Sequence, residues 1–159
     1  MRKVLKRCAV SLGLAAAAAS ATVGAGSAQA APPHTVFQIP ATALATSGLV
    51  VPGPYFANVV AAPTNRPGQT AFSAPAPRSI CSSSAAGSLV RISYVNITTG
   101  QSGAVMVKPC FYYLNPTPVV ATANTGAGQV VATIQVTGSA AYPNAGQPSL
   151  PGVATFAAR

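Results

Sequence analysis

Proline recurs along most of this chain and limits what it can fold into. All fifteen prolines lie between Pro32 and Pro151, and each removes a backbone donor and disfavours the interior of a helix. The same part of the chain contains fifteen Val and five Ile against five Leu, a balance that suits half-buried pleated strands. We therefore expect an all-β fold made of short strands.

The charged residues limit the chemistry that the protein can perform, because the chain contains no Asp or Glu. Its 159 residues include nine Lys and Arg, for a formal charge of +9, and 50% of the residues are apolar. Disordered basic tails instead combine low hydrophobicity with a high content of charged residues. A chain without carboxylates lacks the paired acids of glycosidases and the side-chain ligands of Ca²⁺ or Mg²⁺. We expect a folded domain that is not an enzyme and has no catalytic, cofactor-binding or metal-binding residues.

The first thirty residues have the pattern of a secretory signal peptide. Four cations lie in residues 1–7, and an uncharged Ala-rich stretch follows them. Small residues at Ala28 and Ala30 fit the −3 and −1 positions that a signal peptidase accepts, which predicts a mature chain that begins at Ala31. A retained membrane anchor is the alternative, although Ala, Ser, Gly and Thr partition weakly into hydrocarbon.

This interpretation divides the chain into a signal peptide, residues 1–30, and a single all-β domain, residues 31–159. After cleavage the protein would be secreted or held at the cell surface, with no stable membrane span. Five scattered cations would remain: Arg66, Arg78, Arg91, Lys108 and Arg159. Because they form no cluster, we expect no specific nucleic-acid site. Their diffuse positive field favours association with an unknown extracellular or cell-envelope ligand, for which an anionic surface polymer is one candidate.

Alternating side chains predict most strands in the second half of the chain. Residues 89–97 and 104–108 form one predicted hairpin, and residues 118–122 and 130–137 form a second. Residues 153–157 are predicted to form the last strand.

The first half offers shorter predicted strands, at residues 35–39, 49–51 and 55–60. Residues 61–87 are rich in Pro and Ser, which predicts a long surface loop. Six to eight short strands in total are typical of a small immunoglobulin-like β-sandwich, or of a small barrel.

The two cysteines of the mature chain, Cys81 and Cys110, are expected to form a disulfide, because an exported protein matures in an oxidising compartment. His34 lies near the start of the mature chain, where we expect it to be exposed and without a role. Lys108 is expected to be solvated at the end of a strand. Without a carboxylate to orient it as a base, His34 does not support a hydrolase, and a solvated Lys108 does not support a Ser–Lys dyad.

The sequence also contains a glycosylation sequon and a cluster of aromatic residues. Asn96 begins a sequon for N-glycosylation, which the sequence alone leaves unassigned. Phe111, Tyr112 and Tyr113 form the densest aromatic group, of which we expect two to pack in the core; an exposed platform on which a ligand stacks is the alternative.

These observations favour a secreted or cell-surface β-domain with a binding or structural role and an unknown ligand. A self-assembling extracellular surface component is the alternative, since residues 130–136 have high β-propensity and no charge or Pro. We expect this run to lie inside a sheet with partners on both sides, which predicts a monomer.

Overall fold

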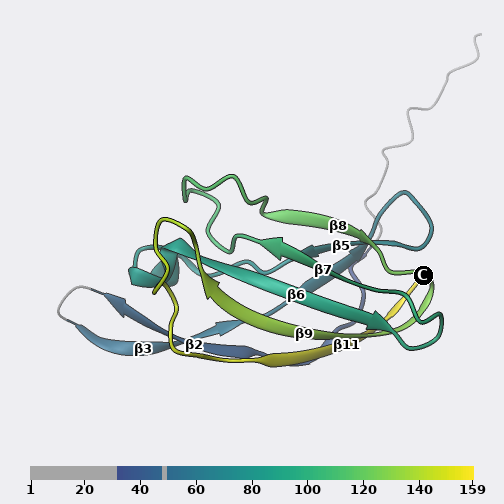
Figure 1. Cartoon of the computed structure of the whole chain (residues 1–159), viewed down its shortest axis with the longest axis horizontal. Helices are drawn as coiled ribbons and strands as arrows, with labels where there is room; N and C mark the ends of the chain where they lie inside the picture. The colour runs from purple at the N-terminus through teal and green to yellow at the C-terminus, as the bar shows by residue number, and fades with distance from the viewer. Residues whose placement is uncertain (1–31, 48–49) are drawn as a thin grey trace, which may run out of the picture.

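The chain folds into three antiparallel sheets (Figure 1). The structure is a computed structural model that describes residues 32–47 and 50–159. The elements are β1 (Phe37–Ile39), β2 (Ala41–Ser47), β3 (Val50–Ala57), β4 (Val60–Pro63), β5 (Gln69–Ser73), α1 (Arg78–Cys81), η1 (Ser84–Gly87), β6 (Ser88–Asn96), β7 (Ser102–Val107), β8 (Val120–Asn124), β9 (Gly128–Gly138), β10 (Ser149–Leu150) and β11 (Gly152–Ala158).

The strand orders are β1-β11-β9-β6-β7, β10-β2-β3 and β4-β5-β8, and none of these sheets closes into a barrel. The all-β class predicted from the sequence is confirmed, but the prediction of six to eight strands is wrong, because the described residues form eleven, several of them only two to four residues long. The predicted signal peptide, with its cleavage residues Ala28, Ala30 and Ala31, lies outside the described residues.

The five-stranded sheet is built on the two longest alternating runs of the sequence. β6 pairs with β7, which confirms the first predicted hairpin. β9 lies between β6 and β11, with Ile92 opposite Ile134 in register. The expected interior position of the run 130–136 is therefore confirmed, although β6 rather than β8 is its neighbour. The residues of β6 and β9 that fill the core are Val90, Ile92, Tyr94, Val130, Ala132, Ile134 and Val136.

The other two sheets form a layer that faces the five-stranded sheet. Every second residue from 55 to 61 is buried, so β3 and β4 present one continuous face to the core. On β5, Phe72 is fully buried. Its ring lies 5.8 Å from the rings of Tyr94 and Phe156, which belong to the opposite sheet. Aromatic contacts across the core therefore hold the two layers together.

The segment from β1 to β2 crosses from one layer to the other at Pro40. Phe37 and Ile39 of β1 are exposed, whereas Ala41 and Ala43 of β2 are buried. The alternation shifts by one residue because a strand that changes layers must present its opposite side to the core. The strand β2 was not predicted, since buried Ala residues give a weak apolar pattern.

The segment from β10 to β11 makes the same crossing beside it. The two segments pair in the same register throughout, from Phe37 opposite Thr155 to Ala43 opposite Ser149. The crossing segments approach closely at Gly152, which has no side chain to keep them apart. The first and last strands of the domain thus form one long antiparallel pair.

The prediction of a single loop over residues 61–87 is wrong. This part of the chain contains most of β4, all of β5, α1 and η1. Its prolines lie at the ends of strands, as Pro63 does, or between elements, and so leave β5 intact. Phe72 supplies the burial that stabilises β5 within this otherwise polar stretch.

The second predicted hairpin is also wrong, because β8 pairs with β5 and not with β9. Gly126 and Gly128 separate β8 from β9 and have φ angles of 69° and 125°, which side chains disfavour. These two glycines turn the chain from one layer into the other. Turn residues alone do not distinguish such a crossing from a hairpin.

Candidate functional site

The segment between β7 and β8 carries several large, exposed apolar side chains. We call residues 108–118 the aromatic loop. A disulfide joins Cys110 of this loop to Cys81 at the end of α1, with the two Cα atoms 5.4 Å apart. The predicted pairing is confirmed, and it fixes the base of the loop to the helix.

Lys108 fixes the conformation of the aromatic loop through hydrogen bonds. Its Nζ donates to the carbonyl oxygens of Tyr113 and Asn115, both at 3.0 Å. The backbone N–H of Lys108 also donates to the Pro118 carbonyl at the other end of the loop. The expectation of a solvated Lys108 is therefore wrong, because the loop folds back over this side chain and offers it two carbonyl oxygens.

Tyr113 attaches the middle of the loop to the rest of the domain. Its ring packs edge to face against Tyr142, with centroids 5.8 Å apart, and its hydroxyl lies 3.5 Å from the Ser139 hydroxyl. A Cβ on Gly87 would come within 3.0 Å of the Tyr113 hydroxyl, so the absence of a side chain there leaves room for the ring. Tyr113 is the aromatic residue of the loop that packs against the rest of the domain.

The other large side chains of the loop point outward. Phe111 is 70% exposed, Tyr112 is 81% exposed and Leu114 is 98% exposed. The expectation that two of the three aromatic residues pack in the core is wrong, because the disulfide and Lys108 hold this loop outside the layers. Leu114 was not singled out from the sequence, and Arg78 was named only as one of five scattered cations. The run of four large residues between two prolines was nevertheless a usable signal for the loop.

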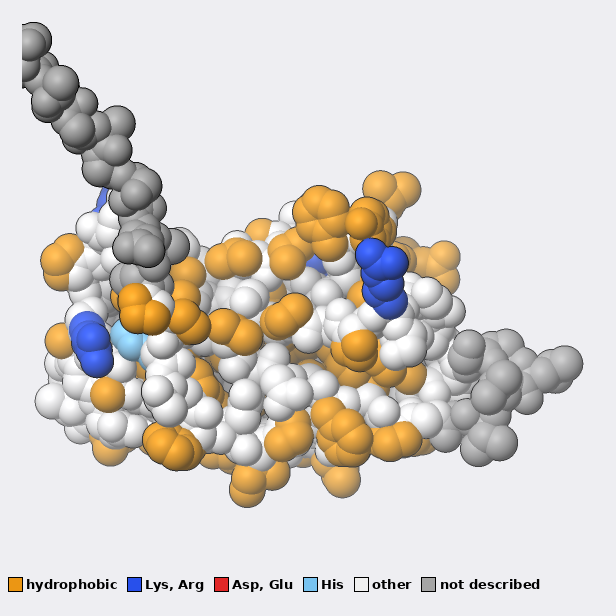
Figure 2. Space-filling view, turned by 180° about the vertical axis from the view of Figure 1, so that it is seen from behind, with side chains coloured by type: hydrophobic (Ala, Val, Ile, Leu, Met, Phe, Trp, Pro, Cys, Tyr) orange, Lys and Arg blue, Asp and Glu red, His pale blue; other side chains and the backbone are white. Residues whose placement is uncertain are grey.

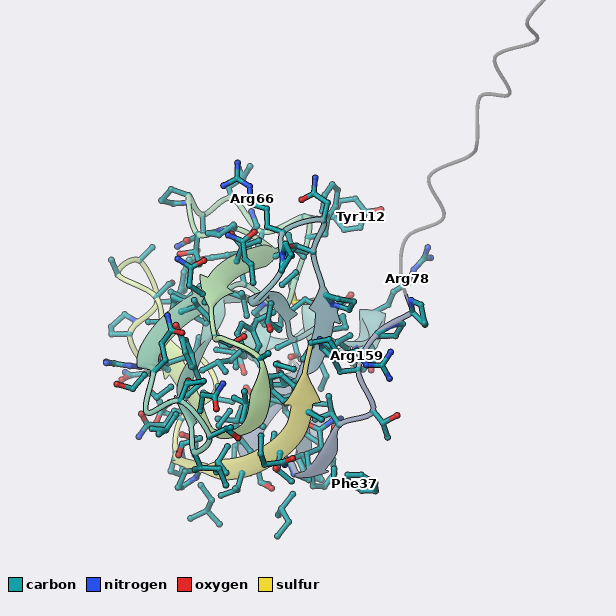
Figure 3. The ribbon with its side chains drawn as sticks, turned by 90° about the vertical axis from the view of Figure 1, so that its right-hand side faces the viewer. Phe37, Arg66, Arg78, Tyr112 and Arg159 are labelled. Atoms are coloured by element: carbon teal, nitrogen blue, oxygen red, sulfur yellow. A yellow bond between two sulfur atoms is a disulfide. The ribbon has the colours of Figure 1, made fainter. Side chains whose placement is uncertain are left out.

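A groove of about 480 Å³ separates α1 from the aromatic loop. Its lining includes Arg78, Ser82, Ala86, Tyr112, Tyr113 and the disulfide. Figure 2 shows hydrophobic side chains gathered beside one cationic side chain at the upper right of this face. In Figure 3, Arg78 and Tyr112 lie on the same side of the molecule. The groove can therefore offer one guanidinium, hydroxyl groups and aromatic rings to the same ligand.

A second hollow, of about 450 Å³, surrounds His34. The His34 ring stacks on Phe156 with centroids 5.5 Å apart, and its Nε2 is buried with no hydrogen-bond partner among the described residues. Burial and, to a lesser extent, the positive charge of Arg159 lower the pKa of His34. The expectation of an exposed His34 is wrong, because its backbone N–H donates to the Ala61 carbonyl and holds it on the fold.

Asn96 has a structural role that the sequon did not indicate. Its side chain is fully buried, and its Nδ2 donates to the carbonyl oxygens of Thr125 and Ala127. Its Oδ1 accepts from the backbone N–H groups of Thr98 and Thr99. Both amide hydrogens are therefore engaged, and the folded chain does not present Asn96 for glycosylation.

No group of three or more His, Cys, Asp or Glu residues lies together in residues 32–47 and 50–159. None of the helices in this part of the chain has the length and hydrophobicity needed to cross a bilayer.

The chain matches no known protein family, no curated protein and no solved structure. Its class is therefore defined by its own structure: a mostly β domain of two packed layers with one disulfide among the described residues.

Proposed function

We propose that the protein is a secreted or cell-surface β-domain, not an enzyme, that binds an extracellular or cell-envelope ligand through the aromatic loop and the groove beside it. The two packed layers, with the first strand crossing between them, support an immunoglobulin-like type of sandwich. The observation that carries the proposal is that Phe111, Tyr112 and Leu114 are exposed on a loop that is fixed to the domain, and that Arg78 lines the groove beside this loop.

Large apolar side chains on a rigid loop favour a binding role. Exposed apolar groups gain free energy when a partner removes them from water. A loop fixed by a disulfide and by Lys108 loses little conformational entropy on binding. Apolar clusters of this kind mark interaction sites on protein surfaces. The nearby Arg78 and the absence of Asp and Glu favour a ligand that carries negative charge.

Export is supported by the disulfide, since such bonds persist in oxidising compartments. Self-assembly through the run 130–136 is less favoured, because β9 has a partner strand on each side and offers no free edge. We therefore propose a monomer.

The test is sedimentation of the purified protein with cell envelopes isolated from the producing cells. The double variant Arg78→Gln, Tyr112→Ser alters the proposed surface. The matched control Arg91→Gln, Phe37→Ser removes an exposed cation and an exposed aromatic ring elsewhere. We expect the wild type and the control to bind the envelopes and the double variant to bind at least about tenfold more weakly. Equal binding of all three proteins, or no binding at all, would overturn the proposal.

A further inference from the structure

We infer that the aromatic loop inserts into the surface of an anionic lipid bilayer, an inference that rests on the proposed function and names its ligand. The protein would lie on the membrane with the tip of the loop among the lipid headgroups and upper acyl chains. No span is required for this mode of attachment, because only the loop enters the apolar region.

The tip of the loop has the side chains that such insertion needs. Phe111, Tyr112 and Leu114 are its exposed large residues, and Leu114 has almost no contact with the rest of the domain. Since the loop is held at Lys108, Cys110 and Tyr113, these three side chains are displayed together. Transfer of each side chain from water to hydrocarbon is favourable.

Part of the loop backbone is already hydrogen-bonded, which favours its approach to an apolar medium. A carbonyl or N–H group that enters hydrocarbon without a partner costs several kcal/mol. Lys108 supplies donors to the carbonyl oxygens of Tyr113 and Asn115. The Tyr113 N–H donates to Cys110, and the Asn115 N–H donates to Tyr113. The N–H and carbonyl groups of Tyr113 and Asn115 are thus hydrogen-bonded within the loop, which lowers the cost of bringing this part of the loop close to the apolar region.

The charges beside the tip indicate the kind of lipid. Arg78 lines the groove next to Tyr112, and the ammonium of Lys108 lies under the loop. The sequence contains no Asp or Glu that would repel a phosphate. Each cation near an anionic membrane surface strengthens binding about fivefold. The complementary surface is therefore a bilayer with anionic headgroups.

The arrangement of the rings favours a lipid over a sugar polymer. The rings of Phe111 and Tyr112 meet at an interplanar angle of 82°, with centroids 5.2 Å apart. These two rings do not form one flat platform on which sugar rings could stack. Phe111 and Leu114 also carry no side-chain group that can hydrogen-bond to sugar hydroxyls. A fluid apolar medium fits these side chains better.

The first experiment uses a fluorescent reporter, for which the chain is well suited because it contains no Trp. Leu114→Trp places a single Trp at the tip of the loop. Phe37→Trp places one at another exposed position, which Figure 3 shows at the opposite end of that view from Tyr112. Each variant is mixed with vesicles of phosphatidylcholine and phosphatidylglycerol in equal amounts. We expect the emission of Leu114→Trp to shift to shorter wavelength and that of Phe37→Trp to remain unchanged.

The second experiment measures sedimentation with the same vesicles. We expect Phe111→Ser, Leu114→Ser to weaken binding about a hundredfold, and the control Phe37→Ser, Ile39→Ser to leave it unchanged. Arg78→Gln should weaken binding about fivefold, and pure phosphatidylcholine vesicles should bind the wild type more weakly. Thermal unfolding of each variant would establish that the exposed substitutions leave the fold intact.

Three results would overturn the inference: no shift for Leu114→Trp, the same shift for both Trp variants, or equal binding of the two double variants. If the wild type binds cell envelopes and the polysaccharide or protein extracted from them, but not vesicles, the lipid inference fails and the proposed function stands. If it binds neither envelopes nor vesicles, both fail.

Discussion

Gly152 of β11 lies directly against Pro40, where the first and last strands cross together between the layers. A Cβ on residue 152 would come within 2.5 Å of the Pro40 carbonyl carbon and of the Ile39 carbonyl oxygen. Real side chains do not tolerate such distances to backbone atoms, which cannot move aside as a flexible side chain can. The crossing therefore requires glycine at this position.

Gly152→Ala should separate the two crossing segments and destabilise the domain. We expect the free energy of unfolding to fall by about 2 kcal/mol or more, as in other overpacked sites. Gly53→Ala is the matched control in β3, because a Cβ there would meet no atom within 4 Å. Chemical denaturation measures both variants. Equal stability of the two would contradict the close approach.

Lys108→Met should loosen the aromatic loop. The substitution removes the ammonium that donates to Tyr113 and Asn115, and hydrogen bonds from charged donors contribute about 1.5 to 3 kcal/mol. We expect chymotrypsin to cleave the native variant within the loop about tenfold faster than the wild type. The control is Arg91→Met, which alters an exposed cation of β6. Unchanged cleavage of Lys108→Met would show that other contacts hold the loop.

Asn96→Ala should remove four hydrogen bonds from the turn after β6. The carbonyl oxygens of Thr125, which is buried, and of Ala127 would lose their donor, so we expect a loss of about 3 kcal/mol in the free energy of unfolding. Asn124→Ala alters an exposed Asn and should cost less than about 0.5 kcal/mol. Denaturant unfolding would compare them, and a cost for Asn96→Ala no greater than that of the control would refute the structural role.

Stability should decrease as the pH falls below about 6.5. The pKa of His34 is lowered from 6.5 in the folded chain, so the unfolded chain binds more protons between that value and the folded pKa. The stabilisation is complete above pH 6.5 and is lost as the pH falls through the folded pKa. No Asp or Glu titrates in this range.

Melting temperatures at pH 5 and pH 7.5 would measure this effect. The variant His34→Phe keeps a ring for the stack on Phe156 but cannot be protonated, so its melting temperature should depend less on pH. A wild type that is equally stable at both values, or a variant with an undiminished pH dependence, would contradict the burial of His34.

The sequence was most informative where large β-branched residues alternate with polar ones. Val90 and Ile92 on β6, like Ile134 and Val136 on β9, give a period of two that only a half-buried strand explains. The disulfide could be predicted from cysteine count and compartment. Local patterns of this kind do not depend on distant partners.

The remaining features depend on contacts between residues far apart in the chain. β2 has a core face made of Ala, which contributes little apolar contrast, and β5 becomes recognisable only when Phe72 reaches the opposite sheet. The partner of β8 is β5 rather than its neighbour in sequence. Tyr112 and Leu114 are exposed because Lys108 holds the loop through its hydrogen bonds. The alternating sequence pattern that predicts β7 does not indicate these hydrogen bonds.

The pairing of the first strand with the last also determines how the domain would respond to mechanical force. Phe37 lies opposite Thr155, and Ile39 lies opposite Val153, so the segments before β1 and after β11 leave this ladder at the same end. A pull that separates them would load the nearest pair first and then each following pair in turn. The crossing at Pro40 and Gly152 would be reached only after the β1–β11 pairs had opened, so stretching would unzip the domain gradually and not shear it in one event.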